Sequence, residues 1–256
     1  TTDGTITIDG VVVGQQVAMI QYANGTAYTF GSLEAAIAKA QPGETVVLLA
    51  DVAMSQILTI DKAITLDGNG KTLTSTAGRA INVETDGEVE IKNLTINAGE
   101  RAVNIINKAA TVELNNVTAT ANNNAVMIAT SAGAVKLTVN NSDLTGLAVV
   151  NVAGAGAQVA INNTKITNVD ANEGENYGAI TVWTSATGAK VVVTGGEIVV
   201  ADDSLKAYVF PADATVTGVD KVGYIVATVG DAGFETLQAA IKNAKAGETI
   251  TLIRDV

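Results

Sequence analysis

Short strand patterns recur roughly every 22–25 residues through the middle of the chain, from residue 58 to residue 200. Each repeat holds three stretches in which aliphatic residues alternate with polar or small ones, so one face of each strand is expected inside and the other outside. A period this short leaves no room for crossover helices, which excludes a doubly wound α/β sheet. The pattern predicts an all-β chain folded as a parallel β-helix, with one coil for each repeat.

Three aliphatic columns define the coils. Neighbouring coils are expected ~4.8 Å apart, so six coils give a rod segment on the order of 30 Å long. The first strands carry Leu58/Ile60, Ile81/Val83, Val103/Ile105, Val126/Ile128, Val150/Val152 and Ile180/Val182. The second strands carry Ile64/Leu66, Val89/Ile91, Val112/Leu114, Leu137/Val139, Val159/Ile161 and Val191/Val193. The third strands carry Leu73, Leu94, Val117, Leu144, Ile166 and Ile198.

The turn after each second strand is rich in asparagine and glycine, the residues that adopt positive φ at the smallest cost. Asparagines stacked at this place in successive coils are expected to hydrogen-bond along the rod as a ladder. We assign this structural role to Asn93, Asn116, Asn141 and Asn163.

Composition narrows the functional classes. Of the 256 residues, 47% are hydrophobic but only 4% aromatic, which suits many short strands rather than a core of large rings. The chain has no cysteine and no histidine, so disulfides, thiolate metal sites and the commonest acid–base group are missing. A net charge of −11 argues against nucleic acid and anionic membranes as partners. No apolar run approaches the ~20 residues of a membrane span.

A longer repeat joins the two ends of the chain. Residues 30–52 recur as 234–256 at an offset of 204, and twelve of the 23 positions are identical. In the first copy, apolar residues at i, i+3, i+4 and i+7 from Leu33 share one face of a short helix. Ser32 is placed to cap the start of that helix and Gly43 to end it.

The first copy is expected to be the N-terminal cap of the rod, with its helix over Ser32–Gln41. Such a helix would shield the open end of the first coil from water and from other chains. The second copy has the same helix pattern from Leu237. Three placements stay open for it: over the last coil, at the start of a following module, or against another subunit in head-to-tail association.

The coils and their asparagine-lined turn resemble the right-handed parallel β-helix of the pectin lyase-like superfamily. The duplicated motif, Phe/Tyr-x-Ser/Thr-Leu-x-x-Ala-Ile-x-x-Ala-x-x-Gly-Glu-Thr-Ile/Val-x-Leu-x-x-Asp-Val, is similar to the start of β-helix repeats in large surface proteins of gut-type bacteria. We therefore expect a β-helix module over residues 1–220, with its cap at 17–52 and its coils at about 53–210. Residues 221–256 would begin a second, partial module.

The same resemblance sets a test for catalysis. It implies that related lyases use a calcium cluster of aspartates with a basic residue, and that related hydrolases use close aspartate pairs with a histidine. The only adjacent acidic pair, Asp202-Asp203, lies past the last clear coil, and neighbours on an extended chain do not face each other across a substrate. Arg79 and Arg101 fall at matching places in successive coils, without an acidic cluster beside them in the pattern. We expect no enzyme, no catalytic residue and no cofactor.

Three features are candidates for binding. The insertion 168–177 offers hard oxygen donors of the type that calcium takes, although a solvated acidic loop is the simpler interpretation. Trp183, with Tyr177 before it, presents an aromatic face on which a sugar ring can stack; its simpler role is to cover the root of the insertion. An outward column of threonines would suit a flat ligand such as ice or a polysaccharide, but threonine is also favoured on exposed strands. That column comprises Thr74, Thr95, Thr118, Thr145 and Thr167.

These observations favour a non-catalytic structural or adhesive repeat module of a bacterial extracellular or cell-surface protein. The first alternative is a carbohydrate-binding β-helix module that uses Trp183 and Tyr177. The second alternative is a polysaccharide-active enzyme. A glycan or protein of a host or neighbouring cell is the expected partner, and head-to-tail self-association stays open.

Overall fold

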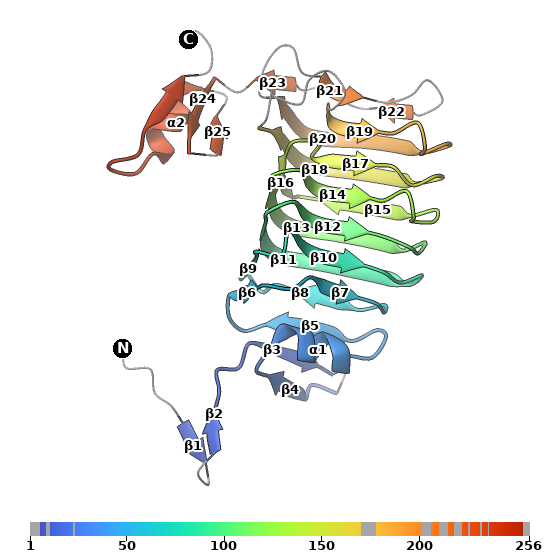
Figure 1. The fold of residues 1–256 in the computed structure, drawn as a ribbon, viewed down its shortest axis with the longest axis vertical. Helices are drawn as coiled ribbons and strands as arrows, with labels where there is room; N and C mark the ends of the chain where they lie inside the picture. Colours follow the sequence, from blue (N-terminus) through green and yellow to red (C-terminus); the bar gives the residue numbers. More distant parts are fainter. Residues whose placement is uncertain are drawn as a thin grey trace.

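The computed structural model of the chain describes residues 6–8, 11–22, 24–169, 178–200, 206–209, 215–217, 222–224, 226–230, 232–234 and 236–252. Its main body is a rod of stacked coils with a helix over one end (Figure 1). A short antiparallel hairpin, β1 (Ile6–Ile8) with β2 (Val11–Val13), precedes the rod.

One wall of the rod is a parallel sheet made from the first strand of each coil. Leu58 lies opposite Ile81, and the register continues without a slip to Ile180. The first aliphatic column therefore stacks as the sequence predicts. The strands are β7 (Leu58–Ile60), β10 (Arg79–Val83), β12 (Arg101–Ile105), β14 (Asn124–Ile128), β17 (Val150–Val152), β19 (Gly178–Val182) and β21 (Lys206–Val209).

The second and third strands of each coil form the other wall. In several coils the two strands are one continuous strand, and in others a short break separates them. The strands are β8 (Thr65–Asp67), β9 (Thr72–Ser75), β11 (Glu88–Ala98), β13 (Thr111–Ala121), β15 (Lys136–Asn140), β16 (Asp143–Gly146), β18 (Gln158–Asn168), β20 (Lys190–Val200), β22 (Thr215–Thr217) and β23 (Val222–Tyr224).

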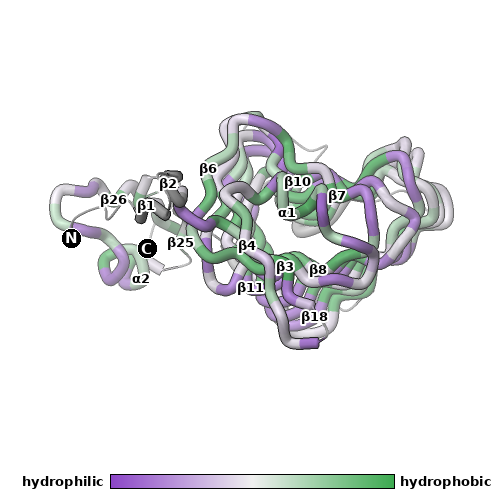
Figure 2. Tube along the Cα trace, turned by 90° about the horizontal axis from the view of Figure 1, so that it is seen from below, coloured by the Kyte–Doolittle hydropathy of each residue, from purple (hydrophilic) through white to green (hydrophobic). Residues whose placement is uncertain are grey.

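Seen along the rod, the coils superimpose around a common interior (Figure 2). The inward aliphatic residues of successive coils form one continuous hydrophobic core. The prediction of an all-β parallel β-helix with a short N-terminal capping helix is confirmed.

The third column differs from the prediction in the second and third coils. Leu73 stacks on Ile96 and then on Ala119, which lies opposite Leu144. Leu94 and Val117 pair with each other one inward position earlier. Beyond the turn, β11 carries two inward residues, Leu94 and Ile96, and β13 carries three, Val117, Ala119 and Ala121. The sequence pattern does not say which of them continues the column.

The cap consists of a small antiparallel sheet and a helix over the first coil. Strand β3 (Ala18–Gln21) pairs with β4 (Ala27–Phe30) on one side and with β5 (Thr45–Leu48) on the other. Between β4 and β5 lies α1 (Leu33–Lys39), whose N-cap Ser32 accepts a hydrogen bond from Ala35 N–H at 3.2 Å. Strand β5 then runs parallel to β8, and β6 (Val52–Met54) pairs with β9, so the cap continues into the first coil.

The second copy of the duplicated motif folds as a separate unit. Strand β24 (Ala227–Val229) pairs antiparallel with β25 (Ala232–Phe234) and with β26 (Ile250–Leu252). In the sequence, helix α2 (Leu237–Asn243) follows β25 and precedes β26. This sheet shares no strand with either wall of the rod. The unit lies beside the end of the rod at the top of Figure 1 rather than stacked over its last coil.

The rod extends past residue 220, the boundary expected from sequence. Strand β23 pairs with β20, with Ile198 opposite Val222 and Val200 opposite Tyr224. The second unit starts at Val226, whose N–H donates to Phe234 O at 2.8 Å as Val17 N–H donates to Phe30 O in the cap.

Candidate functional site

The asparagine turn forms one edge of the rod. The four asparagines named from sequence have φ near +50°, in the left-handed region that costs a residue with a side chain about 1–2 kcal/mol. At Asn93 and Asn116, side-chain hydrogen bonds between coils offset part of this cost. The φ values are 51° at Asn93, 56° at Asn116, 50° at Asn141 and 48° at Asn163.

Amide side chains link the lower coils at this edge. Asn116 Nδ2 donates to Asn93 Oδ1 at 3.0 Å, and Asn93 Nδ2 donates to Asp67 Oδ1 at 3.1 Å. The ladder therefore includes Asp67, which sequence reasoning placed only in the turn.

In the upper coils the amide links run through the preceding residue of each turn. Asn162 Nδ2 donates to Asn140 Oδ1, and Asn140 Nδ2 donates to Asn115 Oδ1, both at 2.8 Å. The Asn-Asn dipeptides were visible in the sequence, but which residue of each pair forms the link depends on how the coils are rotated against each other.

Buried hydroxyl groups take over the next inward position. Leu94 and Val117 fill this position in the coils of β11 and β13. In the next two coils the same position holds Ser142 and Thr164, which are 6% and 1% exposed. Ser142 Oγ accepts from Val117 N–H at 3.1 Å and donates to Asn140 O at 2.9 Å. These contacts satisfy buried polar groups, so the whole edge is structural.

The predicted threonine column is wrong as a single column. Thr95 and Thr118 lie opposite each other and opposite Thr72, whereas Thr74 lies opposite Asn97. The five threonines therefore divide between two neighbouring rows, because the third column is shifted in the second and third coils. The second row reads Thr74, Asn97, Thr120, Thr145 and Thr167.

The first row ends in charges. Beyond Thr118 it continues with Asp143, Lys165 and Glu197 in successive coils. Lys165 Nζ lies 3.9 Å from Glu197 Oε1. This row therefore ends in three charged residues, of which Lys165 and Glu197 form an ion pair.

Arg79 and Arg101 lie opposite each other in β10 and β12, as their spacing indicates. Glu100 lies between them, 3.7 Å from Arg79 Nε and 3.4 Å from Arg101 Nη2. Partial burial lowers the pKa of Arg101, the carboxylate of Glu100 acts in the opposite direction, and the charge of Arg79 adds to the lowering. Arg101 also donates to Asn104 Oδ1 at 3.3 Å. The group therefore braces two coils.

Trp183 lies on the outside of the rod, just after β19, with 39% of its surface exposed. Its indole Nε1 donates to Asn151 Oδ1 of the preceding coil, and its backbone N–H donates to Val152 O at 2.8 Å. The ring is therefore fixed in orientation. Tyr177 and residues 170–176 of the insertion lie outside the described residues, as do Asp202 and Asp203.

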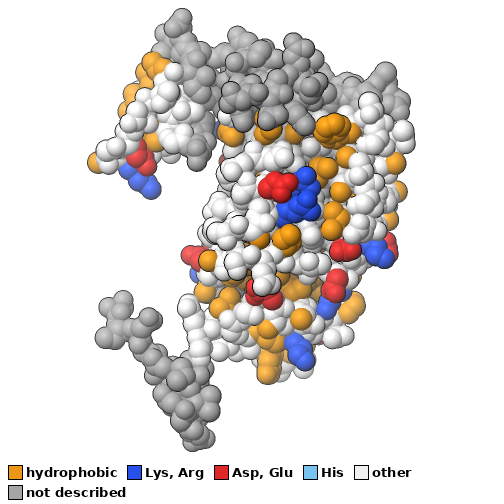
Figure 3. Space-filling view, viewed as in Figure 1, with side chains coloured by type: hydrophobic (Ala, Val, Ile, Leu, Met, Phe, Trp, Pro, Cys, Tyr) orange, Lys and Arg blue, Asp and Glu red, His pale blue; other side chains and the backbone are white. Residues whose placement is uncertain are grey.

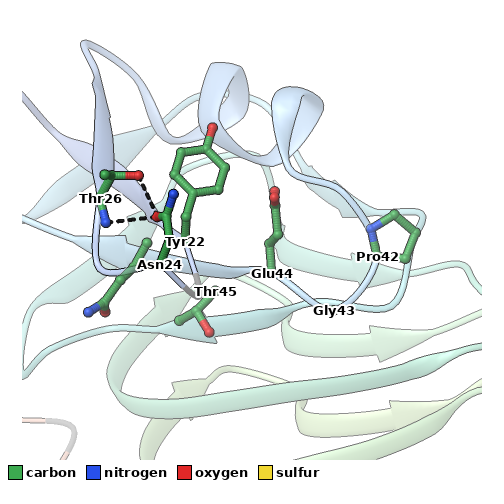
Figure 4. Close-up of a pocket in the computed structure, with 8 residues that line it drawn as sticks. Tyr22, Asn24, Thr26, Pro42, Gly43, Glu44 and Thr45 are labelled. Atoms are coloured by element: carbon green, nitrogen blue, oxygen red, sulfur yellow. Dashed lines mark hydrogen bonds between the residues drawn. The ribbon is translucent and has the colours of Figure 1, made fainter.

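A hollow of ≈ 880 Å³ opens beside the cap (Figure 4). It lies between the β3–β4 loop and the loop that follows α1, with Tyr22 and Thr45 among its lining residues. Two of its polar groups already serve the fold. Asn24 Oδ1 accepts from Thr26 N–H at 3.0 Å, and Glu44 Oε2 accepts from Gln41 N–H at 2.8 Å.

A second hollow of ≈ 550 Å³ lies along the second strands and contains Glu88, Glu90 and Glu113. Partial burial acts to raise the pKa of Glu90, but hydrogen bonds from Lys92, Asn115 and Thr65 and the charge of Lys92 outweigh it, so its pKa lies below the ordinary value. Lys92 Nζ is 3.0 Å from Glu90 Oε2. Glu90 is therefore a fixed anion within a structural network rather than a proton donor.

Charged side chains are sparse on the face shown in Figure 3, where most of the described rod surface is neutral. Within the described ranges, no three acidic side chains come together in a way that could hold a metal ion. The described helices include none that is both long and apolar enough to cross a membrane.

The fold and the site define a class: a parallel β-solenoid with structural side-chain ladders along one edge. Comparison of the chain with protein-family models, curated proteins and solved structures found no match.

Proposed function

We propose that this chain is a non-catalytic structural or adhesive repeat module of a bacterial extracellular or cell-surface protein. The observation that carries the proposal is the unbroken register of the coils from β7 to β19, which makes the segment one rigid stacked body. Amide ladders, buried hydroxyl groups and the ion pair of Lys165 with Glu197 add links between successive coils. Such a body holds its outer turns at fixed spacing, as a stalk or an adhesive surface requires.

A carbohydrate-binding role is the second candidate, and the state of Trp183 favours it. The indole is partly exposed and its orientation is fixed by Asn151, so its ordering on a ligand would cost little entropy. Asn151, which holds the indole, is itself buried at 5% exposure, so the exposed face of the ring would make the contact with a sugar.

Two experiments separate these roles from each other and from catalysis. The whole chain is tested on a glycan array beside Trp183→Ala, with Tyr28→Ala as a matched loss of an exposed aromatic residue on the cap. Binding that Trp183→Ala alone abolishes would establish the carbohydrate role. Binding to none of the glycans would leave the structural role.

Incubation with pectins and mucin glycans, with and without calcium, tests the enzyme alternative. We expect no new reducing ends and no unsaturated products. Sustained product formation by the purified chain would overturn the non-catalytic proposal.

A further inference from the structure

The second unit repeats the cap in its internal bonds. Thr236 Oγ1 accepts from Ala239 N–H at 3.1 Å, the counterpart of Ser32 and Ala35. Lys245 N–H donates to Glu248 Oε2 at 2.7 Å, where Gln41 N–H donates to Glu44 Oε2 at 2.8 Å. Residues 226–252 are therefore a second cap, folded to the same plan.

The two caps differ in what lies against their apolar face. In the first cap, Ile37 is 3% exposed and Leu48 is fully buried. Their counterparts at the same places, Ile241 and Leu252, are 50% and 51% exposed. Hydrophobic side chains are visible on the outer side of this unit in Figure 3.

The first coil covers this face in the first cap, through backbone and side-chain contacts. Strand β5 pairs with β8, with Val46 opposite Leu66. Beside that pairing, Gly43 N–H donates to Ala63 O at 2.7 Å, and Lys62 Nζ donates to Ala38 O at 3.2 Å. Strand β26, in contrast, pairs only with β24 within the described residues, so its other edge is unpaired there.

We propose that the second cap is the start of another solenoid, and that its open face binds a parallel β-coil like the one formed by residues 52–75. The occupant is the segment that continues from Val256, in the position that follows Val52 in the first module. A second copy of the chain fits less well, because its first coil is already covered by its own cap and the backbone groups on that side are in use. This inference deepens the proposed role as a repeat module and rests on it.

The test extends the chain by a copy of residues 53–224 attached after Val256. In the first cap, Thr65 N–H donates to Glu44 O, so the ladder register turns the amides of Val46 and Leu48 toward the first coil, as Gly43 N–H is. Their counterparts in the second cap, the amides of Gly247, Ile250 and Leu252, should therefore face the added coil. We expect their hydrogen exchange to slow at least about a hundredfold in the extended chain. Unchanged exchange at these amides, while the added coils are themselves protected, would overturn the proposal.

Two controls keep the outcome unambiguous. In the extended chain, Ile241→Asp should abolish the added protection, whereas Gln238→Asp, a matched charge at an exposed position of α2, should preserve it. Amide protection of Ala240 and Ala244 in the unextended Ile241→Asp chain shows whether the second cap still folds. Concentration-dependent protection of the Leu252 amide in the unextended wild-type chain would assign the face to a second copy and refute the continuation.

Glycan binding and exchange report on different claims. A positive glycan array changes the proposed function without changing the exchange rate of the Leu252 amide. Failure of the extended chain to protect Leu252 refutes the contact between the second cap and the added coil, but leaves the rod and its register as they are.

Discussion

The two caps share twelve of 23 aligned residues and have matching internal hydrogen bonds, but only one of them has a coil against it among the described residues. The first cap buries Ile37 and Leu48, and the second exposes Ile241 and Leu252. The comparison separates two contributions that usually occur together. The local motif builds the helix, its end caps and the three-stranded sheet, while burial of the apolar face depends on a neighbour.

The largest difference is expected for the matched pair Leu48→Ala and Leu252→Ala. Leu48→Ala leaves a cavity in the core and should lower the free energy of unfolding by about 2–5 kcal/mol. Leu252→Ala should change it by less than about 0.5 kcal/mol, because half of the side chain is already in water. Denaturant unfolding of the rod measures the first loss, and amide exchange in α2 measures the second. Equal losses would mean that the second face is covered.

The turn that follows the helix should behave alike in both caps. Gly43 and Gly247 have φ of +86° and +91°, and no atom lies within 4 Å of a Cβ at either position. Gly43→Ala and Gly247→Ala should therefore each cost about 1–2 kcal/mol from backbone conformation alone. The readouts are rod unfolding for the first and exchange of the α2 amides for the second. An unaffected Gly247→Ala variant would break the equivalence of the two caps.

The helix N-caps should give a smaller effect, again shared by both units. Ser32→Ala and Thr236→Ala each remove the oxygen that accepts an N–H in the first turn, at a cost of about 1 kcal/mol. Ser32→Asp and Thr236→Asp should restore most of the loss, since aspartate caps equally well. Faster exchange of Ala35 and Ala239 amides in the alanine variants, and recovery in the aspartate variants, would confirm that the capping is local.

The smallest effect concerns pH and the contact between the first and second coils. Glu90 reaches Thr65 of the first coil, and its lowered pKa means that its charge stabilises the fold above its ordinary value of 4.5 and is lost as pH falls through the lower folded-state value. Glu90→Gln should cost roughly 0.5 kcal/mol at pH 7. Thermal unfolding should show the gap between variant and wild type closing from pH 7 to pH 3; a widening gap would reverse the assigned sign.

The sequence predicted the coil pattern because each strand is short and its inward residues are aliphatic. The first and second columns were placed in their observed register, and the N-terminal cap was identified from the spacing of apolar residues around Leu33 and the N-cap Ser32. The prediction that Gly43 ends the helix is wrong, because the helix ends at Lys39 with Ala40 as its C-cap and Gly43 lies in the turn that follows. The match between the caps begins earlier than the sequence comparison found, at Val17 and Val226, because the connecting β-hairpin is shorter in the second copy.

The third column shows where sequence reasoning ended. Leu94 and Ile96 are both inward in β11, and only the pairing with Leu73 decides which of them continues the column. The same choice split the threonine row between two registers. The asparagine ladder depends in the same way on which residue of each Asn-Asn pair faces its neighbour across coils.

The alternation of aliphatic and polar residues dictated the strands, the coil length and the amphipathic cap helices, because these depend on contacts between residues near each other in the chain. Register within the longer strands, the links of the side-chain ladders and the different surroundings of Ile37 and Ile241 were decided by tertiary packing. Two identical isoleucines in equivalent helices differ in exposure because burial is set by what lies against a surface, and a local motif contains no information about that neighbour.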